Sequence, residues 1–181
     1  MYRLTNSFPF LVNRVGVRIG EMFGQRLVPY DVSLPMYRVL AALTEQPLQR
    51  LSDLSEMTSI EISTLSRLIG NLSRKGLVSR TRLPDNARTV SISLTSQGCA
   101  LAKELIPLAT HFEEVAIHSF GMEEVSKLKR ALATVYDHLN ELEPEIALAL
   151  ANPVPTRSAA KGKSTRNAAT GRRRTRSSRT K

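Results

Sequence analysis

The chain has 181 residues, of which 41% are hydrophobic and 23% charged, and this composition predicts one folded domain with an ordinary core. The formal net charge is +10, but residues 152–181 hold ten Lys or Arg and no acid, so 16 of the 26 basic residues remain in residues 1–151 against 16 acids. A uniformly basic body is therefore excluded. No apolar run is long enough for a signal peptide or a membrane span.

The first predicted helix covers about residues 7–28. Ser7 precedes it as a cap, and apolar residues follow at the helical period: Leu11, Val15, Ile19, Met22 or Phe23, and Leu27. Gly16, Gly20 and Gly24 form a second stripe, although each glycine costs a helix interior roughly 1 kcal/mol relative to alanine. We expect another helix backbone to pack closely on this stripe, within the subunit or from a partner.

Two shorter helices come next. Ser33 is a natural cap, Pro35 suits a first turn, and four residues share one apolar face: Met36, Val39, Leu40 and Leu43. Pro47 separates this helix from a third, which points Leu51, Leu54 and Met57 inward. A turn at residues 57–59 then leads into a fourth helix over residues 60–75. This arrangement is a helix-turn-helix.

The fourth helix has two different faces. Its predicted inward face holds Ile62, Leu65, Ile69 and Leu72, and its outward face holds Ser63, Thr64, Arg67, Asn71 and Arg74. The outward side chains offer the hydrogen-bond donors and positive charge that phosphates and major-groove base edges require. A capping box between Thr58 and Glu61 predicts the start of this helix, and Gly76 suits the left-handed position after its end.

Two strands follow as a β wing. Residues 78–82 and 90–94 alternate at the period of strands with one covered face, and the loop 83–89 places Arg88 near the hairpin tip. Residues 60–90 hold six bases against two acids, which predicts a basic patch on this part of the chain. The predicted DNA contacts are Ser63, Thr64, Arg67, Asn71, Arg74, Arg80, Arg82 and Arg88. For Arg74, Arg80 and Arg82 the alternative is an ordinary solvated charge.

The region from Thr95 to about residue 150 is predicted as long helices. Thr95 is a natural cap, Pro107 predicts a kink, and a break at residues 120–121 precedes a last helix whose apolar stripe continues to Pro144. The apolar surface of both terminal regions exceeds what one subunit needs, and we expect these helices to form a homodimer. Residues 152–181 lack core-forming residues and are predicted to be disordered.

Two other features have alternatives. Cys99 is the only cysteine; we expect a buried structural thiol rather than a peroxide sensor. His111, Glu114 and His118 have the spacing of a helical metal site, but exposed His and Glu are common on helices, and we expect no metal and no cofactor.

With these elements in place, the chain resembles the MarR family of bacterial transcriptional regulators over roughly residues 7–145. The resemblance rests on four stretches: Leu51-Ser-Asp-Leu54 in the third helix, Thr64–Ile69 and Leu72–Val78 in the fourth helix and its end, and Val90–Gly98 after the wing tip, which ends in an apolar-x-Leu-Thr-x-x-Gly run. Asn86 stands where the family's wing commonly has an aspartate, and the basic tail lies outside the family pattern.

The resemblance implies a mainly α fold with a small β wing: a winged helix-turn-helix at about residues 33–95, within a domain of residues 1–151, and dimerisation helices at about 7–28 and 95–150. It also implies a homodimer that places two recognition helices in successive major grooves of a pseudo-palindromic operator, with Ser63, Thr64 and Arg67 at the bases and Arg88 in the minor groove. Repression would be relieved by a small aromatic or anionic effector. Four aromatic residues are the candidates for its cleft: Phe8, Phe10, Tyr30 and Tyr37.

Other functions are weaker. No phosphate-binding loop, metalloprotease helix or nucleophile motif is present, so we do not expect an enzyme. The main alternative is an architectural nucleoid-type protein that binds DNA without sequence preference through its tail. A winged helix used only for protein contact is a third option. In either DNA-binding case we expect a bacterial cytoplasmic protein associated with the nucleoid.

Overall fold

The computed structural model describes residues 2–83 and 86–151, without the side chains of residues 83, 86–89 and 143–151. It divides into two compact units, residues 1–125 and 126–181. In chain order, the helices and strands are η1 (Leu4–Asn6), α1 (Phe8–Leu27), η2 (Val28–Tyr30), α2 (Leu34–Glu45), β1 (Gln49–Arg50), α3 (Leu51–Thr58), α4 (Ile62–Arg74), β2 (Val78–Leu83), β3 (Asn86–Leu94), α5 (Ser96–Ile117) and α6 (Met122–Ala151). The mainly α fold with a small β wing is confirmed.

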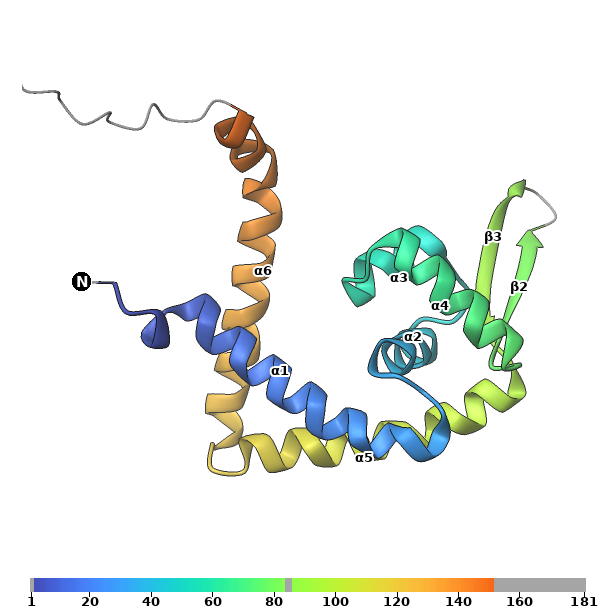
Figure 1. Ribbon diagram of the computed structural model, residues 1–181, viewed down its shortest axis with the longest axis horizontal. Coiled ribbons are helices and arrows are strands. Elements are labelled where there is room, and N and C mark those ends of the chain that lie inside the picture. The colour runs from blue at the N-terminus through green and yellow to red at the C-terminus, as the bar shows by residue number, and fades with distance from the viewer. Residues whose placement is uncertain (1, 84–85, 152–181) are drawn as a thin grey trace, which may run out of the picture. The chain divides into compact units, whose positions relative to one another are not determined.

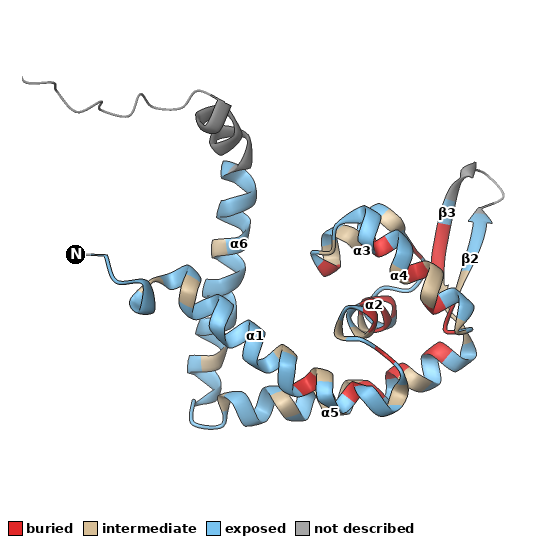
Figure 2. Ribbon diagram, viewed as in Figure 1, coloured by how far each residue is buried: buried red, intermediate tan, exposed pale blue. Residues whose placement is uncertain are grey.

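The core lies where α2, α3, α4, the sheet and the first half of α5 meet, together with the end of α1 (Figure 2). Helix α2 is central to it. Ser33 caps α2 by accepting a hydrogen bond from the Met36 amide, and all four predicted inward residues of this helix are buried. Phe23 of α1 packs against Tyr37 of α2 and Phe112 of α5, with ring centroids 4.7 and 5.8 Å away. These contacts hold the end of α1 and the middle of α5 to the core.

The turn between α3 and α4 differs from the sequence prediction. Thr58 is the last residue of α3, and its hydroxyl donates to the Leu54 carbonyl, so the capping box from Thr58 to Glu61 is wrong. Glu61 itself is the N-cap of α4. Ser59 makes the turn in the left-handed region, at φ 52°, and the Ser55 hydroxyl donates to the Ile60 carbonyl at 2.7 Å. The helix-turn-helix is nevertheless formed as expected.

Helix α4 ends in a tight, hydrogen-bonded turn. Gly76 is left-handed, at φ 69°, as predicted. Its amide donates to the Ser73 carbonyl, and the Leu77 amide reaches back to the Leu72 carbonyl at 2.9 Å, which is the Schellman pattern of helix termination. Leu72 and Leu77 are both buried, so the turn is also fixed by apolar contact.

The sheet has three antiparallel strands in the order β1-β3-β2. The two-residue strand β1 is absent from the sequence prediction, because two residues show no alternation. The side chain of Gln49 is buried there and its amide donates to the carbonyl oxygens of Ala42 and Gln46. Strand β3 begins at Asn86, so Arg88 lies within a strand and not in the loop 83–89 that the sequence predicts.

The junction between the wing and α5 is the closest backbone approach at a glycine in the described residues. The Thr95 hydroxyl donates to the Gly76 carbonyl at 2.6 Å and accepts from the Gly98 amide at 3.0 Å, which confirms Thr95 as the cap of α5. A Cβ added to Gly98 would lie 2.0 Å from the Leu77 carbonyl oxygen. Only glycine fits there, so the Leu-Thr-x-x-Gly run is explained by the packing of α5 on the end of α4.

The long helices partly follow the prediction. Helix α5 is continuous through Pro107, and α6 begins after the expected break, with Glu123 and Glu124 in its first turn. Helix α6 continues past Pro144, where the predicted apolar stripe stops, to Ala151, close to the predicted end at about residue 150. Within residues 2–83 and 86–151, no helix combines the length and apolar character that a membrane crossing requires.

Helix α1 is exposed along most of its length (Figures 1 and 2). Of its predicted apolar stripe, only Phe23 and Leu27 are buried. A Cβ added to Gly16 or Gly24 would meet nothing within 4 Å, and one added to Gly20 would meet the side chain of Leu34 at 3.1 Å. Close backbone packing on the glycine stripe therefore does not occur within the described part of this subunit; packing from a partner stays a prediction.

Candidate nucleic-acid interface

Helix α4 has a dry apolar face and a polar face in solvent. Leu65, Ile69 and Leu72 are fully buried against the core. The predicted outward residues fall on the other side: Ser63, Thr64, Arg67 and Arg74 are exposed and Asn71 is half-buried. Ile62, predicted to point inward, is 51% exposed, because it is the first residue of the helix and the core does not extend over that end.

The polar face begins with a carboxylate. Glu61 accepts hydrogen bonds from the backbone amides of Ser63 and Thr64, at 2.9 and 3.0 Å, and from the Ser63 hydroxyl. These donors, the Ser63 hydroxyl foremost, lower the pKa of Glu61 from 4.5 to about 2. Glu61 is therefore ionised at neutral pH. Glu61 is not among the predicted contact residues, because its spacing from Thr58 predicts a capping box; its place just before the first helical residue is the signal for an N-cap.

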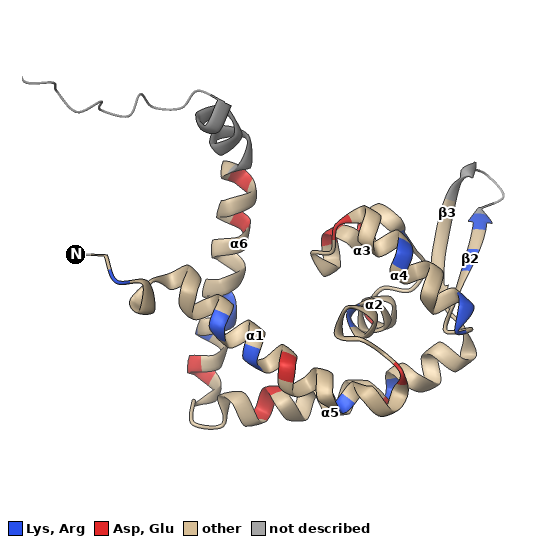
Figure 3. Ribbon diagram, in the orientation of Figure 1, with Lys and Arg blue, Asp and Glu red and all other residues tan. Residues whose placement is uncertain are grey.

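Arg67 lies one turn after Ser63 and is exposed. It makes no hydrogen bond or ion pair with any residue that the structure describes. Figure 3 shows the basic residues of α4 and β2 on this part of the molecule. An unpaired guanidinium on a solvent-exposed helix face can donate to phosphates or base edges without first losing an internal partner.

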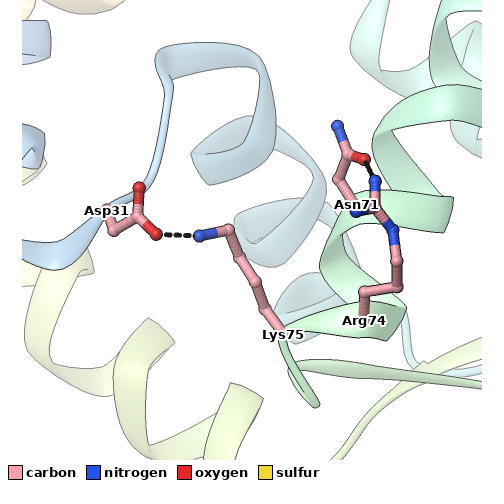
Figure 4. A network of polar contacts seen from close by, with 4 residues as sticks. All are labelled: Asp31, Asn71, Arg74 and Lys75. Carbon is pink, nitrogen blue, oxygen red and sulfur yellow. Dashed lines mark hydrogen bonds and ion pairs between the residues drawn. The ribbon is translucent and has the colours of Figure 1, made fainter.

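The end of α4 is held by polar contacts (Figure 4). Arg74 donates to the Asn71 side-chain oxygen, so these two predicted contact residues are engaged with each other. Lys75 forms an ion pair with Asp31, which follows η2 in a left-handed conformation, at φ 53°. This pair ties the connection between α1 and α2 to the end of the recognition helix.

The arginines of the wing are in different environments. Arg80 of β2 reaches across to α4, where its guanidinium donates to the Ser66 carbonyl at 3.3 Å. Arg82, two residues further along β2, is exposed. The side chain of Arg88 lies outside the described residues. Arg80 and Arg82 are both exposed, and Arg80 in addition supports α4 through this hydrogen bond.

The four aromatic residues proposed for an effector cleft lie in different surroundings. Phe8 is exposed at the start of α1, and Phe10, two residues later, is half-buried. Tyr37 packs on Phe23 in the core, where burial raises its pKa. Tyr30 lines a pocket between η2, α4 and α5, and the effector cleft stays a prediction. Near this pocket the Glu104 carboxylate raises the pKa of Tyr30.

That pocket has a volume of about 460 Å³ and lies between η2, the end of α4 and the first half of α5. Its lining residues are Tyr30, Asp31, Lys75, Leu77, Gln97, Ala100, Leu101 and Glu104. Its charged lining residues are one lysine and two carboxylates, and the lysine is paired with Asp31. A molecule bound there would contact both the recognition helix end and α5.

Two remaining predictions concern Cys99 and the histidines. Cys99 is exposed, so the prediction of a buried thiol is wrong. The buried side of α5 runs through Gly98, Ala102 and Leu105, and Cys99 lies one position round the helix from it. The described residues hold no group of three His, Cys, Asp or Glu close enough to share a metal ion. His118 lies beyond the last residue of α5, where its Nδ1 is 3.0 Å from the Val115 carbonyl.

The geometry of this interface agrees with comparisons to known proteins. A sequence profile of the MarR family matches residues 32–90, which span α2 to most of β3. Over residues 32–90 the chain is therefore similar to the MarR family. The match covers the helix-turn-helix and the wing, and the Thr95–Gly98 junction lies just beyond it.

Curated relatives extend the match beyond the profile. The organic hydroperoxide resistance transcriptional regulator of Bacillus subtilis is 23% identical over 139 residues, 77% of this chain and 93% of the relative. The transcriptional regulator SarZ of Staphylococcus aureus is 29% identical over 124 residues, 68% of this chain and 79% of the relative.

Solved structures confirm the MarR-type fold. Bordetella bronchiseptica BpsR, described with regulation of its DNA binding by 6-hydroxynicotinic acid, gives a TM-score of 0.70 at 24% identity, over 76% of this chain and 98% of that one. A mutant Escherichia coli MarR in complex with operator DNA gives a TM-score of 0.63 at 23% identity, over 69% of this chain and 90% of that one.

Proposed function

We propose that this protein is a MarR-family transcriptional regulator that binds a pseudo-palindromic operator as a homodimer and reads its sequence with α4. The observation that carries this proposal is the two-faced recognition helix. Its apolar face is fully buried, and its opposite face presents Ser63, Thr64 and an unpaired Arg67 to solvent. In helix-turn-helix proteins the N-terminal part of such a helix contacts base edges in the major groove.

The wing supplies the second part of the proposed contact. Arg82 is exposed on β2, and Arg88 lies on β3 near the same hairpin end. We assign Arg88 to the minor groove and Arg82 to the phosphate backbone, since minor-groove contacts are commonly made by arginine. Arg74 and Asn71 are assigned to phosphates beside the end of α4. Arg80 remains one of the proposed DNA-contact residues, and its hydrogen bond to the Ser66 carbonyl also supports α4.

Dimerisation is proposed through the terminal helices. The apolar residues of α1 that the core leaves uncovered, with Val15 58% exposed, offer a surface for a second copy. Helix α6 likewise exposes Leu128, Leu132, Tyr136, Leu139 and Leu142. Two copies related by a twofold axis would bind half-sites separated by about one turn of DNA.

We also propose regulation by a small aromatic effector. BpsR, by its description, responds to 6-hydroxynicotinic acid, and Rhodococcus jostii CouR is described with p-coumaroyl-CoA. In this chain the pocket beside Tyr30 adjoins Lys75 at the end of α4 and Leu101 of α5. An effector there would change how the recognition helix is held relative to α5, and hence the spacing of the two helices in the dimer.

The relatives are named as transcriptional regulators, which favours this function over an architectural one and over an enzyme. We place the protein in the bacterial cytoplasm, on the nucleoid. The tail of residues 152–181 lies outside the described residues, and we assign it a nonspecific contribution to DNA affinity from its ten bases.

A footprint on the DNA upstream of the protein's own gene tests the proposal. The full chain should protect a short inverted repeat, and a variant that ends at residue 151 should protect the same bases with a weaker salt dependence. Uniform coating of the DNA, lost when the tail is removed, would instead establish the architectural alternative.

A further inference from the structure

The start of α4 holds a carboxylate and a hydroxyl in direct contact. Both oxygens of Glu61 are occupied: Oε1 accepts from the Ser63 amide at 2.9 Å, and Oε2 accepts from the Thr64 amide at 3.0 Å and from the Ser63 hydroxyl. Both residues are exposed, so a molecule in solvent can reach these oxygens. This pair therefore lies at the part of the helix that would meet the bases first.

The contact fixes the direction of the Ser63 hydroxyl. A hydroxyl has one donor hydrogen and two acceptor lone pairs, whereas an ionised carboxylate only accepts. The hydrogen shared between them must therefore come from Ser63. As a result, Ser63 has no hydrogen left for a base, and both side chains can offer only acceptors to the groove.

Base edges differ in what they offer to such a pair. In the major groove, adenine and cytosine present an exocyclic amine as a donor, whereas guanine and thymine present a carbonyl oxygen at the corresponding place. An acceptor-only pair facing a carbonyl would bring lone pairs together. The same carboxylate also repels phosphates, which favours a position over the base edges.

We propose that Glu61 and Ser63 form an acceptor-only pair that selects adenine or cytosine at one position of each half-site. This inference rests on the proposed function of α4 and extends it to a specificity determinant. Glu61 acts as a positioning residue for the Ser63 hydroxyl and as an acceptor in its own right. Arg67, which only donates, lies one turn later, about 5–6 Å along the helix, and selects an acceptor-bearing base within about two base pairs.

Selection of binding sites from a random duplex library, with the full chain, tests the inference. The wild-type protein should enrich a half-site in which one position tolerates adenine or cytosine and rejects guanine and thymine by roughly ten-fold or more. Dissociation constants for all four bases at that position are then measured with Ser63→Ala and Glu61→Ala. In both variants the preference should fall to within about two-fold, while preferences at other positions persist.

Two further comparisons separate specificity from structure. Glu61→Ala should bind a nonspecific duplex at least as tightly as the wild type, because it removes a negative charge near the phosphates. Ser63→Ala retains the Glu61 cap and both backbone hydrogen bonds, so it covers the case in which Glu61→Ala weakens α4. Ser73→Ala, an exposed serine at the far end of the same helix, is the matched control and should change no preference.

The outcomes are distinct. An enriched site whose base preferences are unchanged in Ser63→Ala, with at most a uniform loss of affinity, would overturn the acceptor-only pair and leave the proposed function intact. A wild-type protein that enriches no sequence would overturn the proposed function and this inference with it.

Discussion

Helices α1 and α4 are both amphipathic, but their apolar faces meet different surroundings. In α4, Leu65, Ile69 and Leu72 are fully buried within the subunit. In α1, most of the apolar residues remain in solvent, and only the last turns reach the core. Both helices have the same apolar period in the sequence, but this period does not reveal whether the apolar face packs within the subunit or against a partner.

The two helices differ in whether one chain is enough to cover their apolar faces. The winged helix-turn-helix (residues 33–95) is complete within one chain, because its turns, caps and core close on themselves. Helix α1 is not, since roughly 1.5 kcal/mol or more is forgone for each large aliphatic side chain left in water. The exposed stripe of α1 is therefore suited to packing against a second copy of the chain. The substitutions below test first the closed winged helix-turn-helix and then this stripe.

The largest expected effect is at the junction that closes the winged helix-turn-helix. Replacing Gly98 by Ala would place a Cβ 2.0 Å from the Leu77 carbonyl oxygen, so the end of α4 and the start of α5 must separate. We expect the free energy of unfolding to fall by about 3 kcal/mol or more, measured by urea denaturation at fixed protein concentration.

Gly70→Ala is the matched control for this change. Its Cβ would meet only the Arg80 side chain, at an ordinary 3.8 Å, and alanine gains up to about 1 kcal/mol of helix propensity. Equal stabilities for the two variants would mean that the junction does not depend on the Gly98 contact.

The next effect concerns the exposed stripe of α1. Val15→Glu should raise the dissociation constant of the dimer on the order of 100-fold, because a twofold interface counts the lost apolar contact twice. Sedimentation velocity measures the dimer, and circular dichroism should show an intact monomer fold.

Leu48→Glu makes the same chemical change at an exposed residue outside the terminal helices, and it should leave the dimer unchanged. A wild-type dimer that survives Val15→Glu would contradict the assignment of α1 to the interface. Gly16→Leu provides a second probe, because its surroundings within the subunit are empty.

The smallest effect is the pH dependence of the α4 cap. Because the pKa of Glu61 is lowered to about 2 in the folded protein, its contribution to stability is present above the unfolded value near 4.5 and is lost as the pH falls toward 2. The stability difference between the wild type and Glu61→Gln should therefore narrow between pH 5 and pH 3 in thermal unfolding. A difference that stays constant over this range would show that the Glu61 charge does not contribute.

Much of the winged helix-turn-helix could be predicted because its signals are local. Ser33 and Thr95 cap their helices through side-chain oxygens, and Gly76 is left-handed, as the sequence indicates. Glu61 was misassigned because Thr58 offers a competing cap three residues earlier, and only the bond from Thr58 to Leu54 decides between them.

Predictions that depend on neighbours far along the chain were less accurate. Cys99 is exposed because the Leu77 backbone approaches α5 on the side of Gly98, which fixes which face of the helix is inward. Strand β1 is defined by its pairing with β3, because two residues are too few to show the alternation of a strand. Residue type likewise does not reveal that Tyr37 packs on Phe23.

The central claim is that the exposed face of α4 reads DNA sequence. The most direct test compares dissociation constants for the footprinted site and for a scrambled duplex at one salt concentration, using the wild type, Arg67→Ala and the surface control Arg26→Ala. We predict that Arg67→Ala weakens binding to the footprinted site by roughly 30-fold and binding to the scrambled duplex far less. Arg26→Ala should change neither dissociation constant. Equal losses on both duplexes in Arg67→Ala would contradict sequence reading by α4.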